Sequence, residues 1–174
     1  MCSIFGIIGE QNNLKRTAVL KKMAEDQLHR GPDDGGFFED EFCAFGHRRL
    51  SIIDLSTNAR QPMQSNNGRN ILVLNGEIYN YPVLRKELEA CGHTFSSSSD
   101  TECIIHLYEE YGNDMTSRLD GFFAFALSGL ATVCAAALHR RSGALCVYRY
   151  CNSSLRSIAR LIVLIYSVCP MISK

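Results

Sequence analysis

A cysteine stands directly behind the initiator methionine, in the opening run MCSIFGIIGE. If Met1 is removed, the thiol of Cys2 lies beside a free α-amine whose unperturbed pKa is about 7.7–8.0. Such an amine is partly neutral near physiological pH and accepts the proton of the thiol, so one residue supplies both nucleophile and base. The alternative interpretation is a small buried thiol at the end of a strand.

A second candidate is the pair Asn75-Gly76, which follows the apolar run ILVL. A side-chain amide and a glycine N–H can point into the same space, where they hold the oxyanion formed when a thiolate attacks an amide carbonyl. Asn-Gly is also a strong signal for a tight hairpin turn, and taken alone the pair favours that turn. Both interpretations stay open on this pattern.

Charged residues add two binding functions. Arg49 lies in the run GHRRLS and is flanked by apolar residues. Its guanidinium suits bidentate binding of a carboxylate. Two arginines on a strand, however, more often form a solvated face. Asp100 begins an expected helix, where capping is the default role, but it could also accept hydrogen bonds from an ammonium group, as could Glu77. An amide, a carboxylate and an ammonium group occur together in glutamine.

Composition excludes several other classes. The chain has 174 residues, one domain by length, and a net charge of zero, which gives no argument for nucleic acid or an acidic membrane. Charged residues interrupt the opening run before a secretory signal could form, and no apolar stretch reaches the roughly 18 residues of a spanning helix. None of the eight cysteines forms a CxxC pair, so no metal site is expected and a reducing cytoplasm is favoured.

The elements that must position these residues are mixed strands and helices. Strands are expected at 3–9, 43–54, the first part of 70–81, and 120–127, and helices at 14–30, 82–91 and 99–112. Pro82 suits the first position of its helix, and Gly112 suits the residue that ends the last one. The order predicts an α+β layered domain.

With these residues in view, the chain resembles the N-terminal glutaminase domain of glutamine-hydrolysing asparagine synthetase, a class II glutamine amidotransferase of the N-terminal nucleophile (Ntn) hydrolase type. The matching runs, in the family's order over residues 1–127, are MCSIFGIIG, HRGPDDGG, GHRRLSIIDLS, QPM, LNGEIYNYPVLRKELEACGHTF, SDTE and LDGFFAFAL. The resemblance implies a four-layer αββα sandwich, expected to be incomplete at the C-terminus. The RLSIID and NGEIYNY forms favour the asparagine synthetase branch, while the ammonia acceptor is left open.

The resemblance also implies site residues. Cys2 would attack the glutamine amide, and Asn75 with the Gly76 N–H would stabilise the oxyanion. The expected glutamine-binding residues are Arg49, Leu50, Ser51, Ile52, Ile53, Glu77 and Asp100. The loop His29–Asp33 would lie near the site without a chemical step.

A composition break follows Leu127. Residues 1–127 contain all 18 Asp and Glu and 12 of the 18 Lys and Arg, and so carry 12 − 18 = −6, whereas residues 128–174 carry +6. We therefore expect a glutaminase domain at 1–127 and an aberrant basic tail at 128–174, translated out of frame or truncated. A genuine tail that docks a partner is the alternative.

The family's pyrophosphate-binding loop, Ser-Gly-Gly-x-Asp-Ser, has no match in the sequence. No residue is therefore assigned to ATP, magnesium or aspartate, and no cofactor is expected in this chain.

Two function classes remain. The first is a glutaminase that releases ammonia for an ATP-dependent synthetase domain converting aspartate to asparagine. The second is a non-catalytic remnant or interaction module. No membrane or nucleic-acid partner is expected, and a family-type homodimer is left open.

Overall fold

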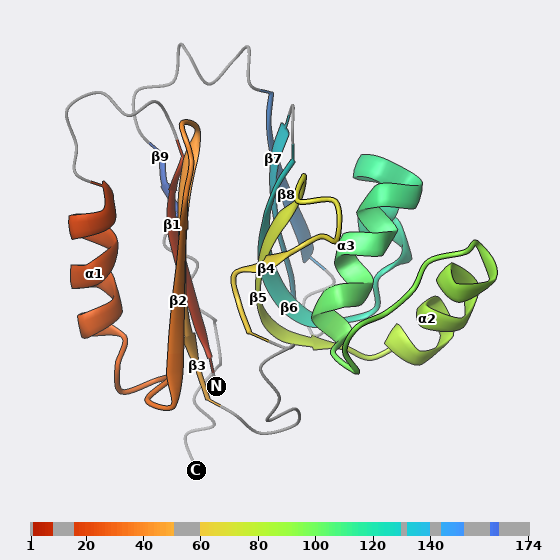
Figure 1. Ribbon diagram of the computed structural model, residues 1–174, viewed down its shortest axis with the longest axis horizontal. Helices are drawn as coiled ribbons and strands as arrows, with labels where there is room; N and C mark the ends of the chain where they lie inside the picture. Colours follow the sequence, from red (N-terminus) through yellow and green to blue (C-terminus); the bar gives the residue numbers. More distant parts are fainter. Residues whose placement is uncertain are drawn as a thin grey trace.

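Two β-sheets pack face to face and helices cover both outer sides in the computed structural model of the chain (Figure 1). The structure describes residues 2–8, 16–50, 60–129, 132–139, 144–151 and 161–163. Across the molecule the layers are one helix, a four-stranded sheet, a five-stranded sheet and a helical layer. This order confirms the expected αββα sandwich.

The four-stranded sheet is antiparallel at every described pairing. Its strands, in spatial order, are β2 (Asp34–Glu39), β3 (Cys43–Arg49), β1 (Ser3–Ile8) and β9 (Leu161–Val163). Ser3 lies opposite Arg48, so the start of β1 is beside the end of β3. Helix α1 (Arg16–Asp26) covers the outer face, where Leu20 and Ala24 pack against this sheet.

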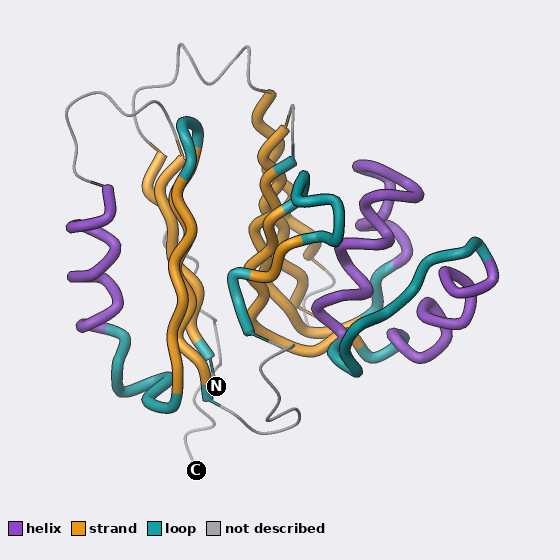
Figure 2. The backbone as a smooth tube through the Cα atoms, viewed as in Figure 1, coloured by secondary structure: helices purple, strands orange, loops and turns teal. Residues whose placement is uncertain are grey.

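The five-stranded sheet is also antiparallel. Its strands, in spatial order, are β4 (Met63–Gln64), β5 (Ile71–Ile78), β6 (Gly121–Ser128), β7 (Thr132–His139) and β8 (Ala144–Cys151). Its outer face is covered by α2 (Tyr81–Ala90), α3 (Asp100–Tyr111) and the 3-10 helix η2 (Gly112–Arg118). The loop between α2 and α3 runs back along α2 to the start of α3 (Figure 2).

Three apolar layers hold the sandwich together, because side chains alternate between the two faces of a strand. Between the sheets lie Ile4, Ile8, Cys43 and Phe45 from one side, and Ile71, Val73, Ala124 and Ala126 from the other. The alternate residues face outward: Phe5 and Ala44 contact α1, and Leu72 and Leu74 join the core under α3. The face on which each side chain lies therefore follows from its position along the strand.

Most expected elements are confirmed, and the differences concern the end of α1 and several elements that were not expected. Helix α1 ends at Asp26 because the next turns tighten to i→i−3 bonds, Leu28 to Glu25 and Arg30 to Gln27. Strand β2 and helix η2 were not expected from the sequence. Strands β7, β8 and β9 lie beyond Leu127, where the sequence shows no sustained period.

Candidate active site

Three predicted site residues take inner-face positions, between the two sheets. They lie at one edge of the sandwich, where strands begin or end. Cys2 continues the series Ile4, Ile8 on β1, and Asn75 continues the series Ile71, Val73 on β5, so both take inner-face positions. Arg49 continues the series Cys43, Phe45 on β3 in the same way. The start of β1 and the ends of β3 and β5 lie toward one edge, the lower edge in Figure 1.

The sulfur of Cys2 contacts the backbone at the end of β3. The Leu50 N–H donates to Cys2 Sγ at 3.4 Å, and the Leu50 carbonyl oxygen lies 3.6 Å from the same sulfur. Cys2 is half-buried. The backbone of Leu50 therefore fixes the position of the sulfur, as a nucleophile requires.

Two other described cysteines are inert by comparison. Burial raises the pKa of Cys43 to about 12, and burial also raises the pKa of Cys103 to about 12, so both are thiols at physiological pH. Cys91 is exposed at the end of α2.

Asn75 is a buried donor without a partner in the described part of the chain. Its side chain lies on the inner face of β5, the residue is 5% exposed, and Nδ2 has no hydrogen-bond partner among the described residues. Leaving a buried donor unpaired costs about 1–3 kcal/mol, so such groups are rare unless a ligand satisfies them. The Asn75 amide is therefore available to bind an oxyanion.

Gly76 lies inside β5 and not in a turn, so the hairpin-turn interpretation of Asn75-Gly76 is wrong. The strand continues to Ile78, and Gly76 pairs with Phe123 of β6. Its φ is +135°, and a Cβ built there would lie 2.2 Å from the Phe122 carbonyl oxygen. Only glycine allows this backbone conformation so close to β6.

The two adjacent arginines have different environments. Arg48 lies on the other face of β3, where its Nε donates to the Ala24 carbonyl oxygen at 3.1 Å. Arg49 is only 9% exposed, on the inner face. A buried guanidinium near Cys2 is suited to binding a ligand carboxylate. The interpretation of both arginines as a solvated face does not fit Arg49.

His47 is a neighbour of Arg49 that sequence reasoning missed. Burial, together with the positive charge of Arg49, lowers the pKa of His47 to about 4, so the imidazole is neutral at pH 7. Its Nε2 is buried without a hydrogen-bond partner among the described residues. The alternation Cys43, Phe45, His47, Arg49 could have placed it on the inner face.

Asp100 joins the start of α3 to the end of β5. Ser99 is the helix cap, since its side chain accepts from the Thr101 N–H at 3.1 Å, and this leaves Asp100 for another role. Asp100 Oδ2 accepts from the Ile78 N–H at 3.0 Å. Burial raises the pKa of the Asp100 carboxyl, and the charge of Glu77 raises it as well. A ligand ammonium group between these carboxylates would relieve that electrostatic cost.

The remaining predicted residues are placed as follows. Glu77 is exposed, and the backbone of Leu50 contacts Cys2 as described. Ser51, Ile52 and Ile53 lie outside the described residues. The loop His29–Asp33 packs against the end of β3, where the Asp33 N–H donates to the Arg49 carbonyl oxygen at 3.1 Å.

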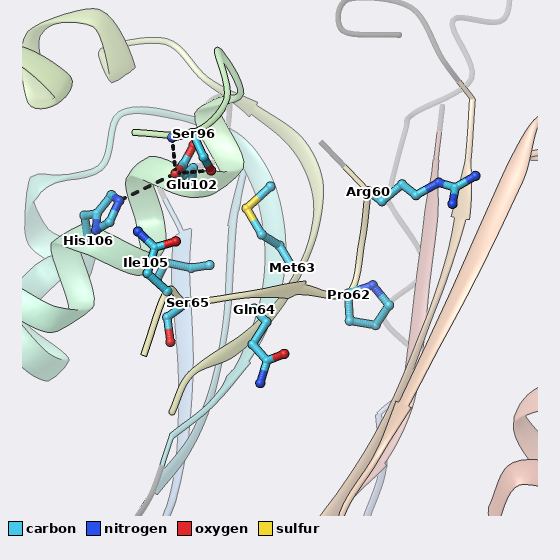
Figure 3. A pocket seen from close by; sticks show the side chains of 10 residues that line it. Arg60, Pro62, Met63, Gln64, Ser65, Ser96, Glu102, Ile105 and His106 are labelled. Carbon is cyan, nitrogen blue, oxygen red and sulfur yellow. Dashed lines mark hydrogen bonds and ion pairs between the residues drawn. The ribbon is translucent and has the colours of Figure 1, made fainter. Parts of the chain in front are cut away.

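A separate pocket of about 150 Å³ lies between α3 and the residues around β4 (Figure 3). Its lining includes Arg60, Met63, Glu102 and His106, and contains none of the predicted site residues. The inner-face edge is therefore a different region from this pocket.

Comparisons with known proteins identify the family of this chain. A family model described as a glutamine amidotransferase domain matches residues 1–154. Glutamine-hydrolysing asparagine synthetase 1 of Bacillus subtilis strain 168 is 44% identical over 131 residues, which are 73% of this chain and 20% of that protein. Glutamine-hydrolysing asparagine synthetase 2 of Arabidopsis thaliana is 40% identical over 129 residues, 73% of this chain and 22% of that protein.

Solved structures confirm the fold. A glutamine phosphoribosylpyrophosphate amidotransferase from B. subtilis, complexed with ADP and GMP, is 23% identical and aligns with a TM-score of 0.64 over 78% of this chain and 37% of that chain. A structure described as the allosteric regulatory enzyme of purine biosynthesis aligns over the same shares with a TM-score of 0.66 and 23% identity.

The fold and the comparisons together define a glutamine amidotransferase domain built as an αββα sandwich. The chain belongs to the glutamine amidotransferase domain family and is homologous to the glutaminase part of asparagine synthetases, and it spans about a fifth of the length of the curated relatives it matches. Within the described residues, no helix is long and apolar enough to cross a membrane.

Proposed function

We propose that this chain hydrolyses the side-chain amide of glutamine to glutamate and ammonia. The observation that carries the proposal is the buried Nδ2 of Asn75, which has no partner among the described residues and lies between the sheets at the same edge of the sandwich as the thiol of Cys2. A nucleophile beside an unsatisfied buried donor is the arrangement that acyl transfer from an amide needs.

The reaction follows from these groups once Met1 is removed. The α-amine of Cys2 takes the thiol proton, and Sγ attacks the amide carbon of glutamine. Asn75 Nδ2 and the Gly76 N–H stabilise the resulting oxyanion. The C–N bond breaks, ammonia leaves with a proton from the α-ammonium, and water then hydrolyses the thioester to glutamate and restores the thiol.

Charged residues at the same edge would orient the substrate. Arg49 would bind the α-carboxylate of glutamine, while Asp100 and Glu77 would bind the α-ammonium, and the backbone of residues 50–53 would line the pocket. The low exposure of Arg49 and the raised pKa of Asp100 support these assignments, because both charges gain from an opposite charge at this site.

The experiment measures glutamate released from glutamine by the purified chain after Met1 removal is verified by mass spectrometry. We expect turnover that is lost in Cys2→Ala and kept in Cys91→Ala, which removes the exposed cysteine. A folded sample that lacks Met1 and releases no glutamate would instead support a non-catalytic remnant or interaction module.

Arg49 provides a second arm of this test. We expect Arg49→Lys to raise the KM for glutamine roughly tenfold or more, because a point charge replaces a bidentate fork. Arg48→Lys is the matched control, since that side chain lies on the opposite face of β3.

We further propose that the ammonia is passed to an ATP-dependent synthetase domain that converts aspartate to asparagine, in the cytoplasm. The names of the relatives support the asparagine branch, and ATP and magnesium belong to that other domain in this proposal. Acceptor assays would detect an amidotransferase of the same branch that uses another acceptor. Light scattering would detect a family-type homodimer. No nucleic-acid or membrane partner is proposed.

We keep the domain boundary near Leu127 as a proposal. The break from −6 to +6 in net charge supports a change of reading frame there, while the family match continues to residue 154. The DNA beyond codon 127 tests it: one alternative frame should resume the family pattern, and the idea fails if neither does.

A further inference from the structure

Two histidines and a glutamate come together on the outer helical layer. His93 lies in the loop after α2, and His106 and Glu109 lie one turn apart on α3. Their candidate ligand atoms all lie within 4.8 Å of one another. His106 is buried, His93 is half-buried and Glu109 is at the surface, so the group is anchored in the core and open to solvent on one side.

The Nδ1 atoms of both imidazoles face the same carboxylate oxygen. His106 Nδ1 lies 3.1 Å from Glu109 Oε2, and His93 Nδ1 lies 3.9 Å from it. Tetrahedral zinc with ligand bonds of about 2.0–2.1 Å separates its ligands by roughly 3.3 Å. The two separations from Glu109 Oε2 bracket that value and all three ligand atoms lie within 4.8 Å of one another, so side-chain movements would close the site around an ion.

The other oxygen of Glu109 is already held. Asn67 Nδ2 donates to Glu109 Oε1 at 3.0 Å, and Asn70 Nδ2 lies 3.4 Å from the same oxygen. These amides fix the carboxylate with Oε2 directed toward the imidazoles. A ligand oriented by its neighbours loses less conformational freedom when it binds an ion.

Each imidazole also has a carboxylate behind it. His93 Nε2 lies 3.2 Å from Glu110 Oε2, and His106 Nε2 lies 3.7 Å from Glu102 Oε1. The buried His106 Nε2 makes no hydrogen bond within the described part of the chain, and Figure 3 shows it directed at Glu102. A carboxylate near the outer ring nitrogen is the partner that metal-bound histidines commonly have, and both imidazoles have one near Nε2 while Nδ1 faces Glu109.

We propose that His93, His106 and Glu109 form a site for a divalent transition-metal ion of the Zn²⁺ class, bound through the two Nδ1 atoms and Oε2, with solvent as the fourth ligand. Two imidazoles and one carboxylate are a donor set that suits zinc, and the open position follows from the surface side of the cluster. The ion links the loop that precedes α3 to the body of that helix. It thereby stabilises the segment that leads to Asp100.

The test measures Zn²⁺ binding to the full chain by isothermal titration calorimetry. His93→Gln and Glu109→Gln are the informative variants, because neither residue is fully buried, and circular dichroism verifies that each is folded. We expect wild-type binding and a loss of affinity of about tenfold or more in each variant. His29→Gln, an exposed histidine beyond the end of α1, is the matched control and should bind as the wild type does.

Cobalt distinguishes this site from the cysteines. A Co²⁺ complex of nitrogen and oxygen ligands shows d–d bands without the thiolate-to-metal charge-transfer band that cysteine ligation produces. We expect the d–d bands in the wild type and their loss in both variants. Absence of Zn²⁺ binding, equal affinity in the folded variants, or a cobalt spectrum of thiolate ligation alone would overturn the proposal.

Discussion

The carboxylate of Asp100 accepts a hydrogen bond from the Ile78 N–H at 3.0 Å, which joins the helical layer to the strand that carries Asn75 and Gly76. The start of α3 is therefore held beside the candidate oxyanion donors. The same carboxyl is buried, and its pKa is raised by that burial. Asp100 thus both holds the start of α3 against β5 and places a carboxyl group at this edge of the sandwich.

Replacing Asp100 by Asn should stabilise the protein at pH 7 and weaken glutamine binding. The folded pKa is raised above 3.8, so the stabilisation from this group is fully present below pH 3.8 and is lost as the pH rises through the folded value. Asn keeps an acceptor for Ile78 and removes the buried charge. We expect a higher Tm at pH 7, no gain at pH 3, and a KM for glutamine raised roughly tenfold to a hundredfold.

Asp114→Asn is the control for this prediction, because that carboxylate is exposed on η2. A lower Tm for Asp100→Asn at pH 7 would show that the carboxylate stabilises the fold in its charged form.

Asn75→Ala should separate catalysis from stability. Loss of an oxyanion donor lowers kcat by about 10²–10³-fold. The free energy of unfolding should not fall, because the buried Nδ2 has no partner to lose among the described residues. Stopped assays of glutamate release and urea denaturation measure the two quantities, with the exposed Asn66→Ala as control. A large destabilisation with unchanged kcat would contradict the assigned role.

Gly76→Ala should destabilise the protein by about 3 kcal/mol or more, since it combines a left-handed φ with a steric overlap against β6. Gly92→Ala isolates the first effect: Gly92 has φ +96°, but a Cβ there meets nothing within 4 Å. We expect about 1 kcal/mol for that control. Equal losses in urea denaturation would show that the approach of β6 is not the cause.

Glu102→Gln should lower the free energy of unfolding by about 2–3 kcal/mol at pH 7. Burial raises the pKa of Glu102, but hydrogen bonds from the N–H and hydroxyl groups of Ser96 and Ser97 outweigh it, and the net pKa is lowered below 4.5. This stabilisation is present above pH 4.5 and is lost as the pH falls through the folded value. The difference from wild type should therefore shrink in acid, while exposed Glu25→Gln shows no such trend.

Native alkylation should divide four of the cysteines into two groups. Iodoacetamide at pH 8 should modify Cys2 and exposed Cys91, and spare Cys43 and Cys103, because burial raises the pKa of both buried thiols to about 12. Peptide mass spectrometry before and after unfolding reads the result. Modification of Cys43 in the folded protein would mean that the space between the sheets opens to solvent.

Local chemistry in the sequence was enough to place most elements. Pro82 and Ser99 mark the starts of α2 and α3, and the apolar runs mark β1, β5 and β6. Asn75-Gly76 misled as a turn signal, because the requirement for glycine comes from β6, which lies far along the chain. Such a tertiary contact has no signature within the strand itself.

The chemical types of the candidate site residues were predictable from the sequence, but not all of their contacts were. Strand alternation would have placed Cys2, His47 and Arg49 on one face once β1 and β3 were paired. The bond between Asp100 and Ile78 was not predictable, since it depends on how α3 docks on the sheet. The neutral state of His47 likewise depends on burial, which spacing alone does not give.

The close approach of β6 to Gly76 also sets the order in which the candidate site can be assembled. The strand that bears Asn75 is synthesised well before Gly121–Ser128, the segment that fixes its conformation. A nascent chain that has not yet produced β6 carries Cys2 and Asn75 but has no partner strand to hold the donor geometry. The proposed capacity to cleave glutamine would thus arise late in synthesis, after the central strand of the second sheet has paired.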